Sequence, residues 1–151
     1  MSEGSEILKL DDFLPYRLSV VSNLVSRMIA QSYQGEGLKL AEWRVLAVLA
    51  ETPAMSQREA AARTRMDKVA ISRAAQMLTE KKLIARAANP DDGRSQLLRM
   101  TTAGQALYAR VMPEAQALNR EIWAAMPDGD AETLFAILAR VEDAALAVAP
   151  E

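Results

Sequence analysis

Residues 56–101 constrain the possible folds of this chain more than any other segment. Helix and turn signals within it predict two short helices joined by a tight turn, and an arginine-rich hairpin follows them. This order of elements is typical of a winged helix-turn-helix, whose second helix enters the major groove of DNA. We therefore expect a mainly α-helical fold with a small β-hairpin.

The same stretch is basic, whereas the chain around it is acidic. Residues 56–101 contain ten lysines and arginines and five aspartates and glutamates, which gives a net charge of +5. The whole chain has a net charge of −2, so the remaining residues carry −7. Because cations attract phosphates most strongly where they cluster, this distribution indicates a site for a polyanion such as DNA.

Two helix starts are marked within the stretch. Ser56 and Glu59 have the spacing of a capping box, in which each side chain accepts a hydrogen bond from the backbone N–H of the other residue. The box predicts a short helix over about 57–64. Asp67 is a good helix cap and predicts a further helix that runs to about Lys82.

The helix predicted after Asp67 has two distinct faces. Its apolar face, suited to a core, comprises Ile71, Ala74, Ala75 and Leu78. Its other residues, which are small, polar or cationic, are Lys68, Val69, Ala70, Ser72, Arg73 and Gln76. Arginine can donate twice to guanine, glutamine can bind adenine, and valine or alanine can contact a thymine methyl. An ordinary solvated face would look similar, but the neighbouring capped helix and basic hairpin favour DNA reading.

A β-hairpin is predicted over residues 83–100, with a turn at 89–93 in which proline fixes φ and glycine can take positive φ. Its positive charge comes from Arg86, Arg94 and Arg99. Arg94, near the tip, could enter a minor groove, where narrow A·T segments concentrate negative potential. Alternatively, the Arg94 side chain pairs with Asp91 or Asp92. Both roles are compatible if Asp92 orients the turn through local hydrogen bonds.

Long amphipathic helices are predicted on both sides of the basic stretch. The first runs to about Tyr33, with Asp11 or Asp12 as its cap, and a shorter helix follows over about 41–51. After the hairpin, Thr101 or Thr102 begins a helix that ends near Met126, and Thr102 with Gln105 has capping-box spacing. The last helix opens at Asp130. The terminal helices carry more apolar surface than one small domain can bury, which suggests a dimer built from both chain ends.

Composition excludes several other classes of protein. The 151 residues are 50% hydrophobic, which suits one domain, or one domain with a dimerisation layer. The chain has no cysteine and no histidine, so disulfides, the commonest metal ligands and the commonest acid-base residue are absent. We therefore expect neither an enzyme nor a cofactor. The acidic N-terminus is unlike a signal peptide, and no apolar run reaches the roughly 18 residues of a membrane span, so we expect a cytoplasmic protein.

With these motifs in place, the chain resembles the MarR family of bacterial transcriptional regulators over about residues 15–148. The most specific part is Asp92-Gly93-Arg94, followed after six residues by Thr101-Thr102-Ala103-Gly104. It resembles the family's D-x-R wing and the L-T-x-x-G start of the next helix, although Met100 stands in place of leucine.

Three further segments carry the resemblance. Residues 68–73 resemble the start of the family's recognition helix, with Ser72 and Arg73 at its usual "SR" positions. Leu83 and Arg86 resemble the link from that helix into the wing. Residues 40–46 resemble the second helix, without the usual capping Thr or Ser.

The resemblance implies a homodimer with intertwined terminal helices that binds pseudo-palindromic operator DNA. The chain, 1–151, would be one winged helix-turn-helix domain, with a DNA-binding lobe over about 38–101 and a dimerisation layer over about 11–34 and 102–148. The residues that we expect to bind DNA are Ser56, Gln57, Arg58, Lys68, Val69, Ala70, Ser72, Arg73, Gln76, Arg86, Asp92 and Arg94. The absence of cysteine argues against the family's peroxide-sensing branch.

The resemblance also implies release from DNA by a small anionic or aromatic ligand, held between the dimer layer and the DNA-binding lobes. Arginine can hold a carboxylate or phosphate through paired donors, and an aromatic side chain can cover a flat ring. An aromatic acid or an aromatic acyl-CoA would suit such a site. The residues that we expect to bind it are Tyr16, Arg17, Asn23, Arg27, Trp43 and Arg44. Alternatively, Trp43 belongs to the core and the arginines only pair with Asp11, Asp12 or Glu42 at the surface.

The favoured function is therefore a ligand-responsive transcriptional repressor. One alternative is a DNA-binding protein without an effector. Another is a winged-helix module whose basic surface binds an acidic protein partner. A sequence-specific footprint on DNA would separate the first two from the third, and adding candidate effectors to that footprint would separate the first from the second.

Overall fold

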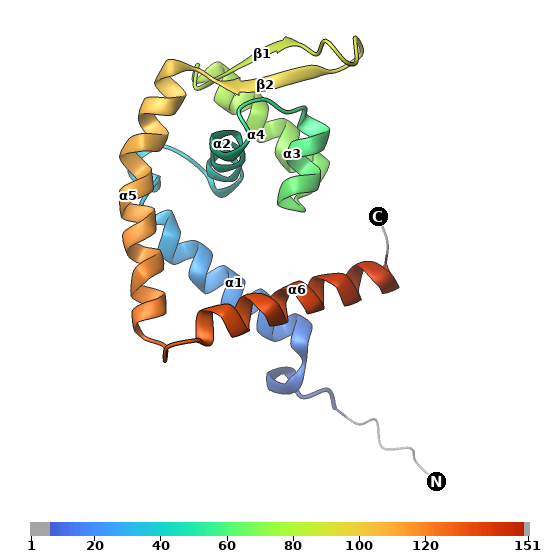
Figure 1. Ribbon diagram of the computed structural model, residues 1–151, viewed down its shortest axis with the longest axis vertical. Coiled ribbons are helices and arrows are strands. Elements are labelled where there is room, and N and C mark those ends of the chain that lie inside the picture. The colour runs from blue at the N-terminus through green and yellow to red at the C-terminus, as the bar shows by residue number, and fades with distance from the viewer. Residues whose placement is uncertain (1–6, 150–151) are drawn as a thin grey trace. The chain divides into compact units, whose positions relative to one another are not determined.

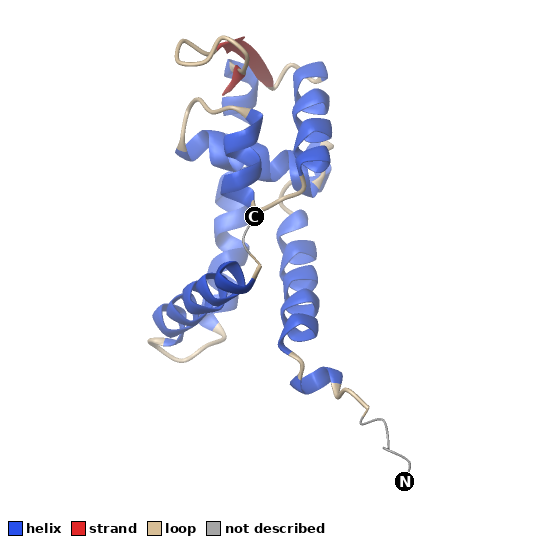
Figure 2. Cartoon of the chain, turned by 90° about the vertical axis from the view of Figure 1, so that its right-hand side faces the viewer, coloured by secondary structure: helices blue, strands red, loops and turns tan. Residues whose placement is uncertain are grey.

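The computed structural model describes residues 7–149, and Figure 1 shows its elements along the chain. In chain order they are the short 3-10 helix η1 (Leu10–Asp12), α1 (Leu14–Ala30), the 3-10 helix η2 (Gln34–Glu36), α2 (Leu40–Glu51), α3 (Gln57–Thr64), α4 (Lys68–Glu80), β1 (Ile84–Ala88), β2 (Gln96–Met100), α5 (Thr102–Ala124) and α6 (Asp130–Val148). The described chain forms two compact units that divide between Ala115 and Gln116, so α5 begins in the first and ends in the second. Among the described residues the one sheet is the β1–β2 hairpin (Figure 2), which confirms the expected mainly α-helical fold.

The core of the first unit lies among α2, α3, α4 and the hairpin. The predicted apolar face of α4, Ile71, Ala74, Ala75 and Leu78, is buried. It packs with buried leucines from neighbouring elements, which include Leu46 and Leu49 of α2 and Leu98 of β2. The buried Ala60 and Ala61 allow α3 to approach closely. This packing leaves the opposite face of α4 in solvent.

The hairpin is held to the start of α3 as well as within itself. β1 and β2 pair antiparallel from Ile84 opposite Met100 to Ala88 opposite Gln96. Met55 forms an isolated bridge with the other edge of β2: its N–H donates to the Leu98 carbonyl at 3.3 Å, and the Leu98 N–H donates to the Met55 carbonyl at 2.7 Å. The chain just before α3 is thereby fixed against β2.

The root of the hairpin is also fastened to the first turn of α5. The Thr101 N–H donates to the Leu83 carbonyl at 3.0 Å, and the Thr101 hydroxyl donates to the Lys82 carbonyl at 2.7 Å. Gly104 passes so close to Leu83 that a Cβ at this position would overlap the Leu83 carbonyl oxygen. Only glycine lacks a Cβ, which gives the glycine of the T-x-x-G pattern a steric reason.

The predicted start and the predicted end of the first helix are both wrong. Asp11 and Asp12 lie in η1, and Phe13 occupies the N-cap of α1 without a side-chain hydrogen bond. Pro15 therefore lies in the first turn of α1, where a backbone N–H would have no helical acceptor, so its absence in proline costs no hydrogen bond. The helix ends at Ala30 rather than near Tyr33, because the chain turns into η2.

Two predicted turn features also differ. Thr101 caps α5, since its hydroxyl accepts from the Gly104 N–H at 3.1 Å, whereas Thr102 is already helical and the second capping box is not used. The left-handed glycines of the described chain are Gly37 and Gly129, so Gly93 does not use its freedom in the hairpin turn.

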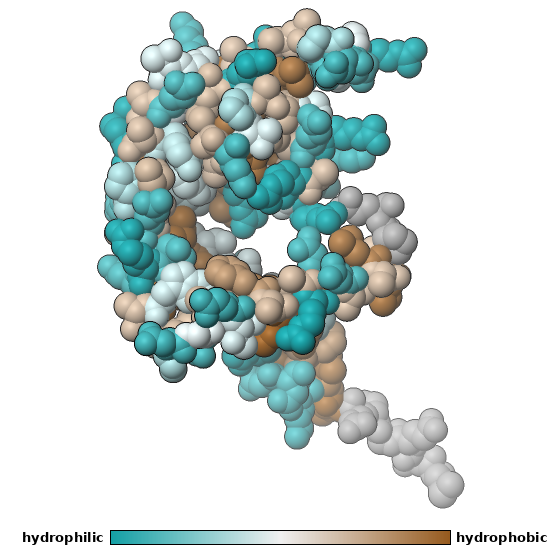
Figure 3. All heavy atoms as spheres, viewed as in Figure 1, coloured by the Kyte–Doolittle hydropathy of each residue, from teal (hydrophilic) through white to brown (hydrophobic). Residues whose placement is uncertain are grey.

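Each unit leaves apolar side chains exposed. In the first unit these side chains lie along η1 and α1 and include Leu10, Phe13, Leu14, Leu18, Val21, Leu24 and Val25. In the second unit they lie on α6 and include Leu134, Phe135, Ile137 and Leu138. Figure 3 shows such hydrophobic atoms at the surface along α1 and along α6. None of the helices that the structure describes is both long enough and apolar enough to cross a membrane.

Candidate functional site

The starts of α3 and α4 are capped as predicted. The Ser56 hydroxyl accepts from the Glu59 N–H at 3.1 Å, and the Glu59 carboxylate accepts from the Ser56 N–H at 2.7 Å. The Asp67 carboxylate accepts from the N–H groups of Val69 and Ala70 at 2.7 and 3.2 Å. These caps fix where each helix begins, and therefore which side chains of α4 face solvent.

The exposed face of α4 carries most of the residues expected to read bases. At about 100° per residue, Val69, Ser72, Arg73 and Gln76 fall opposite the buried face, and all four are exposed. We call these four residues the reading face. Lys68, which is exposed, and Ala70, which is half-buried, lie at its edges. The Gln76 amide donates to the Glu80 carboxylate at 3.2 Å, so it must leave this partner to bind a base.

The other expected DNA contacts meet in a hollow of about 520 Å³ between the start of α3 and the hairpin. Its lining includes Ser56, Gln57, Arg58, Arg86, Asp92 and Arg94, and we call it the wing hollow. The Arg86 guanidinium donates to the Gln57 side-chain oxygen at 2.6 Å, which ties β1 to α3. Three arginines, from α3, β1 and the hairpin turn, thus share one hollow, and such a cluster of cations suits a DNA phosphate.

Asp92 shapes the hairpin turn instead of pairing with the Arg94 side chain. Its carboxylate accepts from the Arg94 backbone N–H at 3.0 Å. The Asn89 side chain accepts from the Asp91 N–H and donates to the Ser95 hydroxyl, each at 3.0 Å. Within residues 7–149 the Arg94 guanidinium has no ion-pair partner. The local bonds therefore hold the turn while the cation stays available.

Two cations of the basic stretch are bound elsewhere. Arg63 pairs with Glu51 at 3.0 Å on the exposed surface. Lys81 pairs with Glu42 at 2.5 Å, and the Glu42 side chain is only 3% exposed. The alternative in which Glu42 pairs with an arginine at the surface is therefore wrong.

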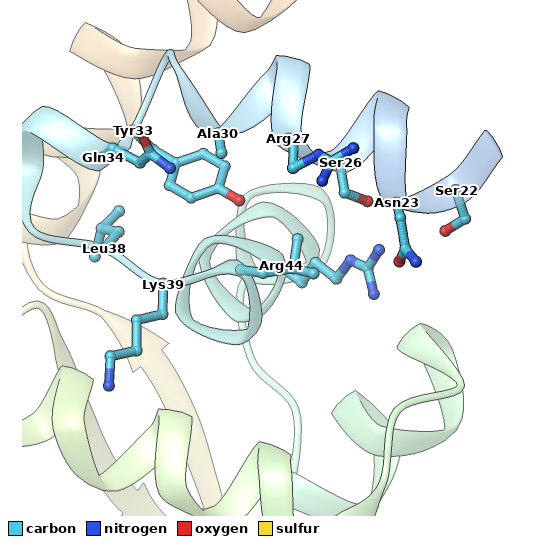
Figure 4. A pocket seen from close by; sticks show the side chains of 11 residues that line it. Ser22, Asn23, Ser26, Arg27, Ala30, Tyr33, Gln34, Leu38, Lys39 and Arg44 are labelled. Atoms are coloured by element: carbon cyan, nitrogen blue, oxygen red, sulfur yellow. The ribbon is translucent and has the colours of Figure 1, made fainter. Parts of the chain in front are cut away.

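A separate cavity of about 650 Å³ lies between α1 and α2 in the first unit. Its polar lining from α1 comprises Ser22, Asn23, Ser26 and Arg27. Arg44 of α2 lies on the opposite side, and Tyr33 lines the end near Leu38. Figure 4 shows the Tyr33 hydroxyl and the Arg44 side chain directed into the space between the two helices.

The structure brings together three of the six residues expected to bind a ligand. Asn23, Arg27 and Arg44 line the cavity, whereas Tyr16 lies in a different hollow beside η1 and Arg17 is exposed outside the lining. Tyr16 and Arg27 are about 16 Å apart along the helix axis, because each residue adds about 1.5 Å.

Trp43 lies behind the cavity wall. Its ring stacks on Tyr33, with centroids 5.6 Å apart, and on Tyr108 of α5, with centroids 5.4 Å apart. Trp43 is half-buried and packs against the core. It therefore supports the position of Tyr33 rather than lining the cavity itself.

Tyr33 is the aromatic residue of the cavity lining, and the sequence analysis missed it. It is 2% exposed, and its hydroxyl has no hydrogen-bond partner among the described residues. Burial raises the pKa of the Tyr33 phenol, and the positive charge of Arg44 offsets part of that rise. The phenol therefore stays neutral at ordinary pH and can donate a hydrogen bond into the cavity.

One sequence signal could have revealed this cavity. Ser22, Asn23, Ser26 and Arg27 recur at successive turns on one side of an otherwise apolar helix, which is a polar stripe without a partner in the sequence. Tyr33 itself follows the helix end, so periodicity could not place it. Within residues 7–149, no group of histidine, cysteine, aspartate or glutamate could hold a metal ion.

Comparisons with known proteins agree with these features. Residues 36–95 match the MarR family. A probable transcriptional regulator from Pseudomonas aeruginosa, known from a crystal structure, is 32% identical with a TM-score of 0.76, over 88% of this chain and 99% of that one. A putative transcriptional regulatory protein for the hcr operon of Thauera aromatica is 30% identical over 106 residues. That match covers 70% of this chain and 64% of the relative, slightly less than two thirds of its length.

A more distant structure shares the fold over almost the whole chain. CouR from Rhodococcus jostii RHA1, bound to p-coumaroyl-CoA, is 22% identical with a TM-score of 0.72, over 96% of this chain and 98% of CouR. At that identity the likeness concerns the fold alone. The family match over the α2–α4 region, together with the nearly full-length relative from Pseudomonas aeruginosa, shows that the chain belongs to the MarR family of transcriptional regulators.

Proposed function

We propose that this protein is a sequence-specific DNA-binding repressor that a small aromatic acid or aromatic acyl-CoA releases from its operator. The observation that carries DNA binding is the joint exposure of the reading face and of three arginines in the wing hollow. Helix α4 would lie in a major groove, where Arg73 and Gln76 can reach base edges. Arg58, Arg86 and Arg94 would contact phosphates or the minor groove beside it.

The proposal includes a homodimer. The apolar side chains exposed on η1 and α1, and those exposed on α6, need a partner surface, and a second copy of the chain can supply it. Residues of about 11–34 and 102–148 would form this dimerisation layer, and about 38–101 the DNA-binding lobe. Two copies of α4 would then enter successive major grooves, about 34 Å apart.

The ligand proposal rests on the cavity between α1 and α2. Arg27 and Arg44 bring two guanidinium groups to it, and the Tyr33 hydroxyl adds a neutral donor. A carboxylate can accept from all three groups, since charge-assisted hydrogen bonds are the strongest that side chains form. CouR, which has the same fold, is bound to p-coumaroyl-CoA, so a thioester of an aromatic acid belongs among the candidates.

Release requires that the ligand prefers one conformation of the protein. A ligand that bound the DNA-bound and free forms equally well would release nothing. We therefore expect the ligand to favour a dimer whose two reading faces no longer match the spacing of the grooves. The winged-helix module that binds an acidic protein remains the competing reading of the same basic surface.

Selection of duplexes from a random pool, followed by a footprint on the best one, tests DNA binding. We expect a pseudo-palindromic site with half-site centres about 10 base pairs apart. Arg73→Ala should lose the preference for this site, whereas the matched control Arg63→Ala should keep it, because Arg63 pairs with Glu51 outside both proposed DNA surfaces. Enrichment of no sequence above the starting pool would contradict the proposal and favour the protein-binding alternative.

Calorimetry with benzoate, 4-coumarate and 4-coumaroyl-CoA tests the ligand site. Arg44→Ala should weaken the binding of a carboxylate by about tenfold or more, since a hydrogen bond to a charged group contributes about 1.5–3 kcal/mol. Arg17→Ala removes the same charge from α1 outside the cavity and should leave binding unchanged. Equal losses in both variants would place the site elsewhere, and no binding by any of the three compounds would favour a DNA-binding protein without an effector.

A further inference from the structure

The end of α4 is attached to two other segments by one lysine. The Lys81 ammonium donates to the Glu42 carboxylate of α2 at 2.5 Å and to the Gly37 carbonyl at 2.8 Å. The Glu42 side chain is 3% exposed and that of Lys81 is 31% exposed. We call this group of Lys81, Glu42 and the Gly37 carbonyl the Lys81 clamp.

The Lys81 clamp is not a surface ion pair. Among the described residues, Glu42 is the one buried side chain that carries a formal charge. Removal of a carboxylate from water is costly unless a cation and hydrogen bonds replace the lost hydration. Lys81 and Glu42 belong neither to the reading face nor to the wing hollow, and the Lys81 ammonium is paired with the Glu42 carboxylate. Contact with DNA therefore does not explain why a buried carboxylate is paired with a lysine at this position.

The segments that the Lys81 clamp joins are those that the proposed function must connect. Gly37 has φ of 74°, ends η2 and precedes Leu38, which lines the ligand cavity. Glu42 lies two residues before Arg44, which lines the same cavity. Lys81 is the C-cap of α4 and follows Arg73 by about two helical turns.

We propose that Lys81 and Glu42 are positioning residues that couple the ligand cavity to the recognition helix α4. This inference rests on the proposed function. A ligand that moves the chain around Leu38 or Arg44 also moves the Gly37 carbonyl or the Glu42 carboxylate. Because separation would leave a buried carboxylate unpaired, Lys81 and the end of α4 follow them. The reading face then changes its angle to the rest of the first unit.

Linkage makes this coupling reciprocal, so DNA alone can test it without an identified effector. Trp43 stacks on the cavity residue Tyr33 and reports on the cavity wall. In a Trp123→Phe background Trp43 is the only tryptophan, since the chain contains two. The operator duplex found by selection should change the Trp43 emission of this parent, because docking of α4 moves the cavity wall through the Lys81 clamp.

Two variants should uncouple the cavity from DNA. Lys81→Met keeps the aliphatic stem and removes the ammonium, and Glu42→Gln removes the charge of its partner. Each should reduce the DNA-induced change in Trp43 emission by more than half while the protein still binds the duplex. Lys81→Arg, which restores a cation, should recover part of the change. Lys82→Met is the matched control: it removes the same charge one residue away, where the side-chain ammonium has no partner within the described chain, and should keep the full change.

If a single variant fails to fold, the pair Glu42→Leu with Lys81→Met replaces the ion pair by apolar contacts, which buried sites often tolerate. Hydrogen exchange supplies a second measurement that needs no DNA. Lys81→Met should speed amide exchange by about fivefold both in residues 37–40 and in the last turn of α4, since loss of one anchoring hydrogen bond costs about 1 kcal/mol. Lys82→Met should change neither segment.

The outcomes separate the inference from the proposed function. Failure of every duplex to bind would contradict the proposed function, and the exchange experiment would still decide the inference. Binding without any change in Trp43 emission, or an unchanged response in Lys81→Met and Glu42→Gln, would overturn the coupling alone. Exchange that rises in only one of the two segments would also overturn it.

Discussion

At the scale of single residues, Tyr33 shows how a buried side chain can present a hydrogen-bond donor to a cavity. Its phenol is almost fully buried and lacks a partner within the described chain, so its hydrogen-bond donor is offered to whatever enters the cavity. Periodic patterns predict which helix residues share a face, but Tyr33 lies after the end of α1. Its neighbour Arg44 was predicted because cations on helices are visible in the sequence.

The ionisation of Tyr33 gives a direct test of its surroundings. Since burial raises its pKa, Tyr33 should ionise above the usual value near 10, and after exposed tyrosines. The folded protein holds this proton more tightly than the unfolded chain, so the associated stability is complete below pH 10 and is lost as pH rises through the folded pKa. Ultraviolet titration of the parent and of Tyr33→Phe checks this. A late-ionising phenol that persists in Tyr33→Phe would contradict it.

Gly104 predicts a steric effect on stability. Gly104→Ala would place a Cβ on the Leu83 carbonyl oxygen, so the hairpin root or α5 must shift. Overpacking of this kind costs typically 1–3 kcal/mol, and more where backbone must move. Gly35→Ala is the control, because a Cβ there meets nothing within 4 Å and the residue is not left-handed. Denaturant unfolding should show a clear loss for Gly104→Ala alone, and equal midpoints for the two variants would refute the argument.

Replacement of Arg73 and of Arg94 by alanine should affect DNA binding in different ways. Arg73 lies on the reading face, so Arg73→Ala should cost about 1–3 kcal/mol and relax the preference at one operator position. Arg94 lies in the wing hollow, so Arg94→Ala should weaken binding to many sequences and lower the salt slope by about one. Binding titrations at several salt concentrations separate the two effects. Parent-like binding by both variants would show that these surfaces do not meet DNA.

At the scale of elements, the helices with strong local signals were predicted well. The capping box placed α3, and Asp67 placed the start of α4, because each signal lies within three or four residues of the structure that it determines. The start of α1 was predicted wrongly, since two plausible aspartates precede a residue without a capping side chain, Phe13. Local chemistry alone does not decide between such neighbours.

Long-range partners were outside the reach of the sequence. Lys81 was counted among the cations of the basic stretch, but its partner Glu42 lies 39 positions earlier in the chain. The three predicted cavity residues of α1 and α2 came together, whereas Tyr16 did not, because periodicity identifies a face and not the part of it that meets a neighbour. The identity of packed pairs depends on tertiary structure, which periodicity does not encode.

The capping box of α3 provides a prediction at this scale. Ser56→Ala removes the acceptor for the Glu59 N–H and should cost about 0.5–2 kcal/mol of stability. Ser56→Asp keeps an acceptor at the cap and should restore most of that loss. Thermal unfolding followed by circular dichroism measures both variants. A Ser56→Ala protein as stable as the parent would show that the box contributes nothing to α3.

At the scale of the whole molecule, the exposed apolar surface predicts association. We expect sedimentation at micromolar concentration to show a homodimer, because the side chains exposed on η1, α1 and α6 are too many for a soluble monomer. Leu18→Glu places a negative charge on this surface of α1 and should weaken the dimer, whereas Ala62→Glu adds the same charge to the exposed side of α3, outside the proposed dimerisation layer, and should not weaken it. A folded, stable monomer of the parent would refute the dimer.

The fastening of the hairpin root to α5 has a mechanical consequence. The hydrogen bonds of Thr101 and the close contact of Gly104 with Leu83 join the strands tightly to the first turn of α5. The hairpin and that turn should therefore rotate together as one rigid lever. The lever arm is the length of β2, about 17 Å for five residues at about 3.3 Å each. A tilt of about 5° at the root therefore displaces the tip by about 1.5 Å, enough to break a hydrogen bond. Arg94 lies near the tip of the hairpin, where a small rotation of α5 produces the largest displacement.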